Sequence, residues 1–228
     1  LLSTHQQTTS GKMATKKSQR IAIWVIAGVL VVGTLAGFIA MMVAPGNEAR
    51  DQAELQAAQA EWQSQQDAQT KELNDKYFAT FSQYASRVGE FSADGINELK
   101  TEDLLVGDGD EVNDDTSIAV YYIGWNPKGE IFDQSIDGDS LKAPFAVDGP
   151  ATASVIEGWQ KGLVGMKIGG VRELTIPSSQ AYGETGSGDK IPANTPLKFV
   201  VMAIPSVEEI PTPQIIKDYY KRQYGIEL

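Results

Sequence analysis

The sequence predicts an α+β protein in which one short helix packs across a curved sheet. The helix is predicted to begin at Val155, because apolar residues recur from there every three or four positions and so share one face. A glycine pair, Gly169 and Gly170, is expected to end it, and residues 171–176 are expected to form a strand. The apolar face of the helix consists of Val155, Ile156, Trp159, Leu163 and Met166.

A long apolar segment precedes this domain. Residues 21–44 contain no charged side chain and only one polar side chain, that of Thr34. At about 1.5 Å of rise per residue, a helix of this length exceeds the roughly 30 Å hydrocarbon core of a bilayer. Basic residues precede the segment, whereas the first acidic residue, Glu48, follows it. The positive-inside rule therefore predicts a transmembrane helix over residues 21–44 and a cytoplasmic tail over residues 1–20.

A cleaved signal peptide is the alternative for this segment, with the small residues around Thr34-Leu35-Ala36 as a cleavage site. The apolar region of a signal peptide has about 7 to 15 residues, so we favour a retained signal anchor. The chain contains no cysteine, which excludes disulfides and lipid attachment through cysteine. The residues before Met13 are polar and without pattern, and we expect Met13 to be the natural start.

The part of the chain after the apolar segment is strongly acidic. The chain has 19 basic and 30 acidic residues, and all of the acidic ones but only 15 of the basic ones follow residue 44. The predicted extracytoplasmic part therefore carries a formal charge of −15. Such a charge favours solubility and argues against nucleic acid as a partner.

Residues 46–92 are predicted to form a helical stalk. They are rich in Ala, Gln and Glu, which favour helix, and residues 47–88 contain neither Gly nor Pro. The second half carries one apolar stripe, formed by Leu73, Tyr77, Phe81, Tyr84 and Val88. We favour a spacer helix whose far end docks on the following domain. A coiled-coil dimer is the alternative, although the heptad pattern does not extend through the polar first half.

Seven segments between residues 99 and 205 occur in the order and at the spacing of one known family. They are LKTEDLLVGDGDEV, AVYYIGW, GEIFDQS, PFAV, VIEGWQKGLVGMKIGG, IPSSQAYG and IPANTPLKF. Residues 97–206 thereby resemble the FKBP-type peptidyl-prolyl cis-trans isomerases, and the chain resembles a membrane-anchored, bacterial-like member. The resemblance implies an FKBP-like curved antiparallel sheet wrapped on one short helix. It also implies an enzyme that accelerates rotation about X-Pro bonds without a cofactor.

The resemblance further implies an apolar pocket for the proline ring of the substrate. Six residues match family positions that act in catalysis: Tyr122, Phe132, Asp133, Trp159, Tyr182 and Phe199. Four more match substrate-binding positions: Phe145, Val155, Ile156 and Ile191. On pattern alone, such apolar and aromatic residues are more often ordinary core residues, so the assignment depends on the resemblance.

The chain departs from the family pattern at the rim of this pocket. The loop after Asp133 carries Asp137 and Asp139 where better-studied members have a basic residue. Lys142 is then the one cationic neighbour expected for Asp133. The later loop departs from the family at Ser187, Lys190 and Ala193. We expect these changes to affect substrate preference and macrolide affinity more than isomerisation.

Two further patterns suggest ligand sites but have the wrong spacing. The acidic residues at 108–115 do not match an EF-hand, because Val112 occupies the fifth position. The glycine-rich residues 183–188 precede neither a helix nor a Lys-Ser/Thr pair, as a phosphate loop would. We therefore predict neither a metal site nor a phosphate site in these segments.

Residues 207–228 are predicted to form a C-terminal helical extension. Thr212 as a cap and Pro213 in the first turn suit a helix start. The apolar face of this helix would consist of Ile215, Ile216, Tyr219, Tyr220 and Tyr224. Such a face most often packs on its own domain, and we favour that over binding to the stalk or to another protein.

These features together predict a single-pass membrane protein that displays an isomerase domain outside the cytoplasmic membrane. Its expected substrates are X-Pro bonds of exported polypeptides, and macrolide FKBP inhibitors are possible ligands. The protein is expected to be a monomer or a stalk-mediated dimer. The alternative function is an FKBP-fold binding module with little turnover.

Overall fold

The computed structural model describes residues 48–227. The predicted cytoplasmic tail (1–20) and transmembrane helix (21–44) lie outside these residues. Between residues 48 and 227, no helix combines the length and the apolar character needed to cross a membrane.

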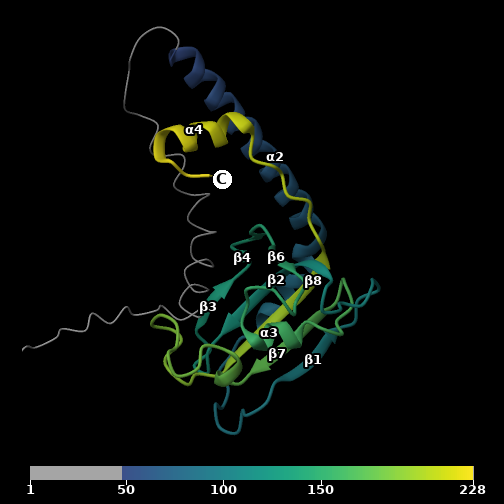
Figure 1. Cartoon of the computed structure of the whole chain (residues 1–228). Helices are drawn as coiled ribbons and strands as arrows, with labels where there is room; N and C mark the ends of the chain where they lie inside the picture. The colour runs from purple at the N-terminus through teal and green to yellow at the C-terminus, as the bar shows by residue number, and fades with distance from the viewer. Residues whose placement is uncertain (1–47, 228) are drawn as a thin grey trace, which may run out of the picture. The chain divides into compact units, whose positions relative to one another are not determined.

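Six strands in the described part of the chain form one antiparallel sheet (Figure 1). Its order is β1-β7-β8-β2-β3, and β6 pairs with a different stretch of β2 from β3. A separate hairpin of β4 and β5 follows β3. The strands are β1 (Lys100–Leu105), β2 (Ser117–Trp125), β3 (Ile131–Gln134), β4 (Ile136–Asp137), β5 (Ser140–Leu141), β6 (Phe145–Asp148), β7 (Val171–Ile176) and β8 (Leu197–Pro205). The strand predicted at residues 171–176 is confirmed.

Both faces of the middle of this sheet, formed by β7, β8 and β2, are largely buried. Successive side chains of a strand point to opposite faces, so β2 contributes Val120 and Tyr122 to one core and Tyr121 and Ile123 to the other. The first core lies under the short helix α3 (Glu157–Gly162), and we call it the helix-side core. The second, which includes Tyr121 and Ile123, lies under the stalk, and we call it the stalk-side core.

The helix α3 is shorter than predicted. Ile156 precedes it with an extended backbone, φ −62° and ψ 149°, and Leu163 is its C-terminal cap. The prediction of a helix from Val155 to the glycine pair is therefore wrong. The reason is the glycine content of the segment, since glycine lowers helix propensity and Gly165 adopts φ +78°.

Two glycines on one face of α3 allow it to lie close to β7. A Cβ atom added to Gly162 would lie 2.8 Å from Cδ2 of Leu174. A Cβ atom added to Gly158 would overlap the side chain of Ile176. These two glycines weaken the helix but allow a close contact between helix and sheet, and this contact brings Trp159 onto the sheet.

The stalk is helical, as predicted. The helix α2 (Glu48–Ser82) continues into a short 3₁₀-helix, η1 (Gln83–Arg87). Phe81 is 0% exposed and Tyr77 is 8% exposed, and both rings lie 6.1 Å from the ring of Tyr121. The other stripe residues, Leu73, Tyr84 and Val88, pack against the same stalk-side core. The apolar stripe thus docks on the sheet, and the stalk-mediated dimer stays a prediction.

A buried carboxylate joins the end of the stalk to the sheet. Glu173, 4% exposed, accepts hydrogen bonds from Arg87 Nε at 2.8 Å and from Lys198 Nζ at 2.6 Å. Burial alone would raise the pKa of Glu173, but the hydrogen bonds from Arg87 and Lys198 outweigh it and lower that pKa below 4.5. Residues from η1, β7 and β8 therefore meet at one ion-pair cluster.

Replacing Glu173 with Gln should flatten the acid side of the stability curve. Because the folded-state pKa of Glu173 is depressed, its contribution is fully present above the unfolded-state pKa and is lost as the pH falls through the folded-state pKa. Urea unfolding between about pH 3 and pH 7 measures this, with the exposed Glu184→Gln as the matched control. Equal acid slopes in Glu173→Gln and the unsubstituted chain would contradict the expectation.

The C-terminal segment packs along the stalk. Its helix α4 (Gln214–Tyr224) contacts α2, and the two lie side by side in Figure 1. Before α4, Trp62 Nε1 donates to the carbonyl oxygen of Ile210 at 3.2 Å, and Gln69 Nε2 donates to that of Glu208 at 2.9 Å. The prediction that this helix packs on the sheet domain is therefore wrong, and the less favoured stalk contact is observed.

The ends of α4 agree only in part with the sequence prediction. The N-terminal cap is Pro213, without a side-chain cap, rather than Thr212. Gly225 caps the C-terminus in the left-handed conformation, with φ 66°. Within α4, Ile216 is buried, whereas Tyr224 is 60% exposed.

Candidate active site

Five aromatic rings from four strands and one helix meet at one end of the helix-side core. The ring of Trp159 lies 5.2 Å from Tyr122, 5.3 Å from Phe199 and 6.1 Å from Phe145, each in an edge-to-face arrangement. Phe132 adds a further edge contact with Phe199 at 5.4 Å. Edge-to-face packing is the favoured geometry for such rings. We call Tyr122, Phe132, Phe145, Trp159 and Phe199 the aromatic cluster.

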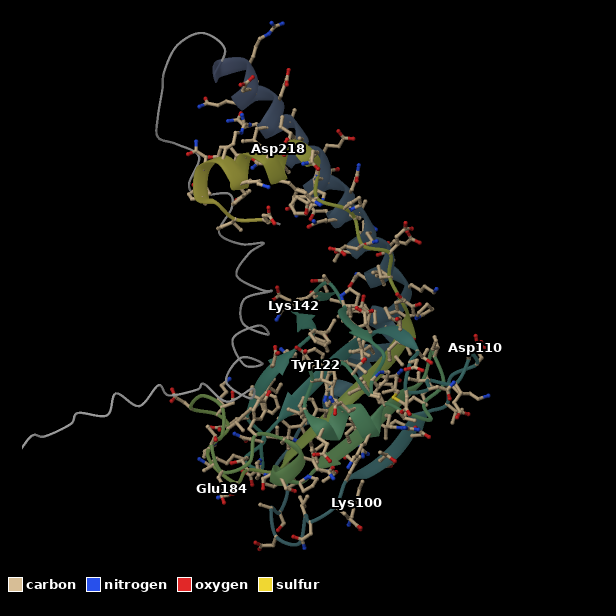
Figure 2. The ribbon with its side chains drawn as sticks, in the orientation of Figure 1. Lys100, Asp110, Tyr122, Lys142, Glu184 and Asp218 are labelled. Carbon is tan, nitrogen blue, oxygen red and sulfur yellow. The ribbon has the colours of Figure 1, made fainter. Side chains whose placement is uncertain are left out.

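The register of the sheet places these rings together. In β2, Gly124 is opposite Phe199 of β8, and Val120 is opposite Phe145 of β6. Phe132 lies on β3, which pairs with the same end of β2. Trp159 comes from α3 and lies among them, and Tyr122, labelled in Figure 2, is on β2 among the side chains beside α3. Residues that are up to 77 positions apart in sequence, from Tyr122 to Phe199, therefore form one cluster.

The cluster has a buried base and a partly exposed rim. Trp159 and Phe199 are 5% and 4% exposed. Tyr122, Phe132 and Phe145 are only partly buried, and so retain surface that a ligand could cover. The indole Nε1 of Trp159 has no hydrogen-bond partner among the described residues.

A tyrosine–carboxylate pair provides the polar part of the site. Tyr122 Oη donates a hydrogen bond to Asp133 Oδ2 at 2.5 Å, and the Gln134 backbone N–H donates to Asp133 Oδ1 at 2.8 Å. Burial, reinforced by the hydrogen bond to Asp133, raises the pKa of Tyr122 far above 10.0. Tyr122 therefore stays protonated at neutral pH and keeps its donor directed at Asp133.

The expected cationic neighbour of Asp133 has another partner. Lys142 Nζ donates to the carbonyl oxygen of Gln134 at 3.0 Å, and no ion pair with Asp133 occurs in the described part of the chain. The carboxylate of Asp133 is held by a phenol and a backbone N–H instead.

The remaining predicted site residues lie around the cluster. Val155 and Ile156, both partly buried, pack against the helix-side core just before α3. Ile156 is the N-terminal cap of α3, at an end where helix N–H groups lack intrahelical acceptors. Tyr182 follows the 3₁₀-helix η2 (Ser178–Gln180), and burial, together with Asp133, raises the pKa of its hydroxyl. Ile191 is 4% exposed within the same core.

The loop that carries Ile191 is attached to the start of β3. Lys190 Nζ donates to the carbonyl oxygen of Ile131 at 2.6 Å, and the Ser187 backbone N–H donates to that of Ile191 at 2.7 Å. The altered residue Lys190 therefore holds the loop against the edge of β3. Ala193 is exposed nearby in sequence.

Sequence reasoning missed three residues that position the site. Asn126, 3% exposed, donates to Glu130 Oε2 at 2.7 Å and to the Lys190 carbonyl oxygen at 2.9 Å, so it joins the β2–β3 turn to the loop. A Cβ atom at Gly124 would lie 2.6 Å from Phe199 and 2.7 Å from Phe132, so only glycine allows those rings to meet. Ser135 Oγ accepts the backbone N–H of Tyr122 at 2.9 Å. Such positions carry no sequence signal beyond a small or amide side chain near a turn.

The arrangement offers ring surfaces, two phenol groups and one carboxylate. The described residues contain no histidine, and the only histidine of the chain, His5, lies outside them. A partly exposed aromatic surface beside a fixed hydrogen-bond pair suits the binding of an apolar ring and a neighbouring carbonyl group.

Comparisons with known proteins match the same region. A family model described as FKBP-type peptidyl-prolyl cis-trans isomerase matches residues 109–204. An FK506-binding protein of Neisseria meningitidis serogroup A is 41% identical over 106 residues, which are 46% of this chain and 94% of that protein. A probable FKBP-type 25 kDa peptidyl-prolyl cis-trans isomerase of Pseudomonas aeruginosa is 38% identical over 111 residues, 47% of this chain and 45% of that protein. A solved peptidyl-prolyl cis-trans isomerase from Pseudomonas syringae pv. tomato is 32% identical, with 61% of this chain and 93% of that chain covered and a TM-score of 0.40.

Proposed function

Because this chain belongs to the FKBP-type peptidyl-prolyl cis-trans isomerases, we propose that it isomerises X-Pro bonds of exported polypeptides, with the aromatic cluster as the site for the proline ring. The observation that supports this site is the partly exposed rim of rings over buried Trp159, next to the Tyr122–Asp133 pair. All ten residues predicted for the site lie in or against the helix-side core or, in the case of Asp133, bond to a residue that does.

The chemistry requires only that the site bind the twisted amide more tightly than the planar one. Rotation about an X-Pro bond has a barrier of about 20 kcal/mol, because the twisted form loses amide resonance. Polar solvent favours the planar form, which carries more charge separation. A surface of rings that excludes water removes that preference, so differential binding lowers the barrier. No covalent bond forms or breaks in this reaction.

Each residue of the site has its own proposed role in binding the substrate. Trp159 and Phe199 support the proline ring from below, while Phe132 and Phe145 flank it. Tyr182 and the N–H of Ile156 are available to substrate carbonyl groups. Asp133 keeps the Tyr122 ring in place through their 2.5 Å hydrogen bond. Relatives are named as FK506-binding proteins, so we also propose that macrolide FKBP inhibitors bind at the same rings.

The test is the cis-to-trans isomerisation of a short Xaa-Leu-Pro-Phe peptide in the presence of residues 46–228. We expect acceleration that FK506 inhibits. No acceleration by a chain that is folded by circular dichroism would contradict the enzyme. It would instead support the alternative function, an FKBP-fold binding module with little turnover.

The proposed location outside the cytoplasmic membrane rests on the apolar residues 21–44 and on the charge difference across them. Fractionation of cells that express the chain should recover it with membranes, and protease added outside the cytoplasmic membrane should degrade residues 48–227. Recovery of a shortened, soluble chain would instead support the cleaved signal peptide.

A further inference from the structure

We propose that Asn74 on the stalk helix is a positioning residue for the isomerase site, acting through the β4–β5 hairpin. This inference rests on the proposed function and goes beyond it, because it gives the stalk a part in turnover. The stalk would then be more than a spacer between membrane and enzyme.

The contact itself is a hydrogen bond from the hairpin to the stalk. The backbone N–H of Leu141 donates to Asn74 Oδ1 at 2.8 Å. The Leu141 side chain is 3% exposed and belongs to the stalk-side core with Tyr77 and Phe81 of α2. Ile136, at the other strand of the hairpin, packs against the same core. The stalk therefore holds the hairpin through one polar and several apolar contacts.

The hairpin depends on such outside contacts. Its two strands have two residues each and form a sheet of their own, separate from the main sheet. A two-stranded hairpin is at best marginally stable in water. Its position is therefore set by whatever packs against it, and α2 is the helix that does so.

A short path of hydrogen bonds leads from the hairpin to the tyrosine–carboxylate pair. Next to Leu141, the backbone N–H of Lys142 donates to the carbonyl oxygen of Ser135 at 2.8 Å. Ser135 is 4% exposed and exchanges two bonds with Tyr122: its N–H donates to the Tyr122 carbonyl oxygen at 2.8 Å, and its Oγ accepts the Tyr122 N–H. Tyr122 in turn holds Asp133.

The stalk also holds the other flank of β3. After η1, the backbone N–H of Phe91 donates to the carbonyl oxygen of Pro127 at 3.0 Å, and Glu90 forms a bridge with Lys128. Phe132 and Asp133 thus lie between two points at which the N-terminal segment is attached. Removing one attachment should loosen β3 on that side without unfolding the main sheet.

The experiment compares Asn74→Ala and Asn74→Asp in the full 228-residue chain, kept in a mild detergent because of residues 21–44. Alanine removes the acceptor and keeps the helix, whereas aspartate keeps an oxygen at the same place. Asp75→Ala is the matched control, since the exposed Asp75 side chain pairs only with Lys71 in the described part of the chain. The readouts are kcat and KM for the peptide, hydrogen exchange of the Leu141 amide and the urea midpoint.

We expect Asn74→Ala to lower kcat about threefold to fivefold, the size of one net hydrogen bond, with a smaller change in KM. The Leu141 amide should exchange faster, while amides of β2 and β8 keep their protection. Asn74→Asp should restore both kcat and protection, and Asp75→Ala should match the unsubstituted chain.

An active chain whose kcat is unchanged by Asn74→Ala would overturn the proposal, and so would a loss that Asn74→Asp does not restore. A lower urea midpoint with kcat unchanged would give Asn74 a structural role only, which also overturns it. If the unsubstituted chain fails to accelerate isomerisation, the proposed function itself is contradicted, so the two failures are distinguishable.

Discussion

Replacing Phe81 with Ala should lower the free energy of unfolding of the whole sheet domain by about 3–5 kcal/mol. Phe81 is a stalk residue, yet its side chain is 0% exposed and packs on Tyr121 of the central strand β2. Deleting a buried aromatic ring loses its transfer free energy and leaves a cavity. The measurement is urea unfolding of residues 46–228, followed by fluorescence of the buried Trp125 and Trp159.

The control for this result is an exposed position on the same helix. Glu72→Ala should change the free energy of unfolding by no more than about 0.5 kcal/mol, as surface substitutions usually do. If Phe81→Ala behaved like Glu72→Ala, the stalk would be an independent spacer. The stalk-side core would then not contribute to the fold.

Phe132→Ala or Asp133→Val should reduce turnover of an X-Pro peptide at least tenfold, which is about 1.4 kcal/mol of transition-state stabilisation. Phe132 supplies partly exposed ring surface, and Asp133 accepts the hydrogen bond of Tyr122. Neither is fully buried, so both variants should keep the cooperative unfolding of the parent chain. The rate of cis-to-trans isomerisation of the peptide checks the loss of turnover, and urea unfolding curves of both variants check that they stay folded.

A second series separates the two halves of the polar pair. Tyr122→Phe removes the donor and keeps the ring, so the double variant Tyr122→Phe/Asp133→Val should lose less than the sum of the two single losses. Asp137→Asn, on the exposed rim, should retain the parent turnover. Unchanged turnover in both Phe132→Ala and Asp133→Val would mean that the substrate binds elsewhere.

The sequence predicts elements with a strong local pattern. The strand at 171–176 and the stalk helix were expected at nearly the observed places, the strand because it follows a glycine pair and the helix because residues 47–88 favour helix and contain neither Gly nor Pro. The helix at 157–162 was overestimated, because Leu163 and Met166 keep a helical spacing although the backbone has already turned. The spacing of apolar side chains predicts which residues are buried. It does not by itself predict a helix, because glycine allows the backbone to leave the helical conformation.

Only the site residues at positions that match the family pattern could be predicted from the sequence. The rings of the aromatic cluster came from the resemblance, and the structure brings them within edge-to-face distance. Asn126, Ser135 and Asn74 act through contacts with backbone groups far along the chain. An amide or hydroxyl near a turn is too common to predict such a partner, since the contact depends on the tertiary fold.

The tail had no family pattern to guide it. Ile216 of its predicted apolar face is buried, whereas Tyr224 is 60% exposed, and two surfaces could cover this face, the sheet domain and the stalk. The hydrogen bonds of Trp62 and Gln69 to tail carbonyl oxygens decide for the stalk. Periodicity shows that a face must be covered and does not show by what.

The pairing of stalk and tail has a consequence for biosynthesis. Trp62 and Ile210 are 148 positions apart, and Gln69 and Glu208 are 139 apart, so α2 meets these partners only when nearly the entire polypeptide has been made. Contacts of such long sequence separation form late and slow the folding rate. During synthesis, Trp62 and Gln69 of α2 therefore stay without these partners until the tail has emerged, and a chain released before residue 208 lacks both hydrogen bonds.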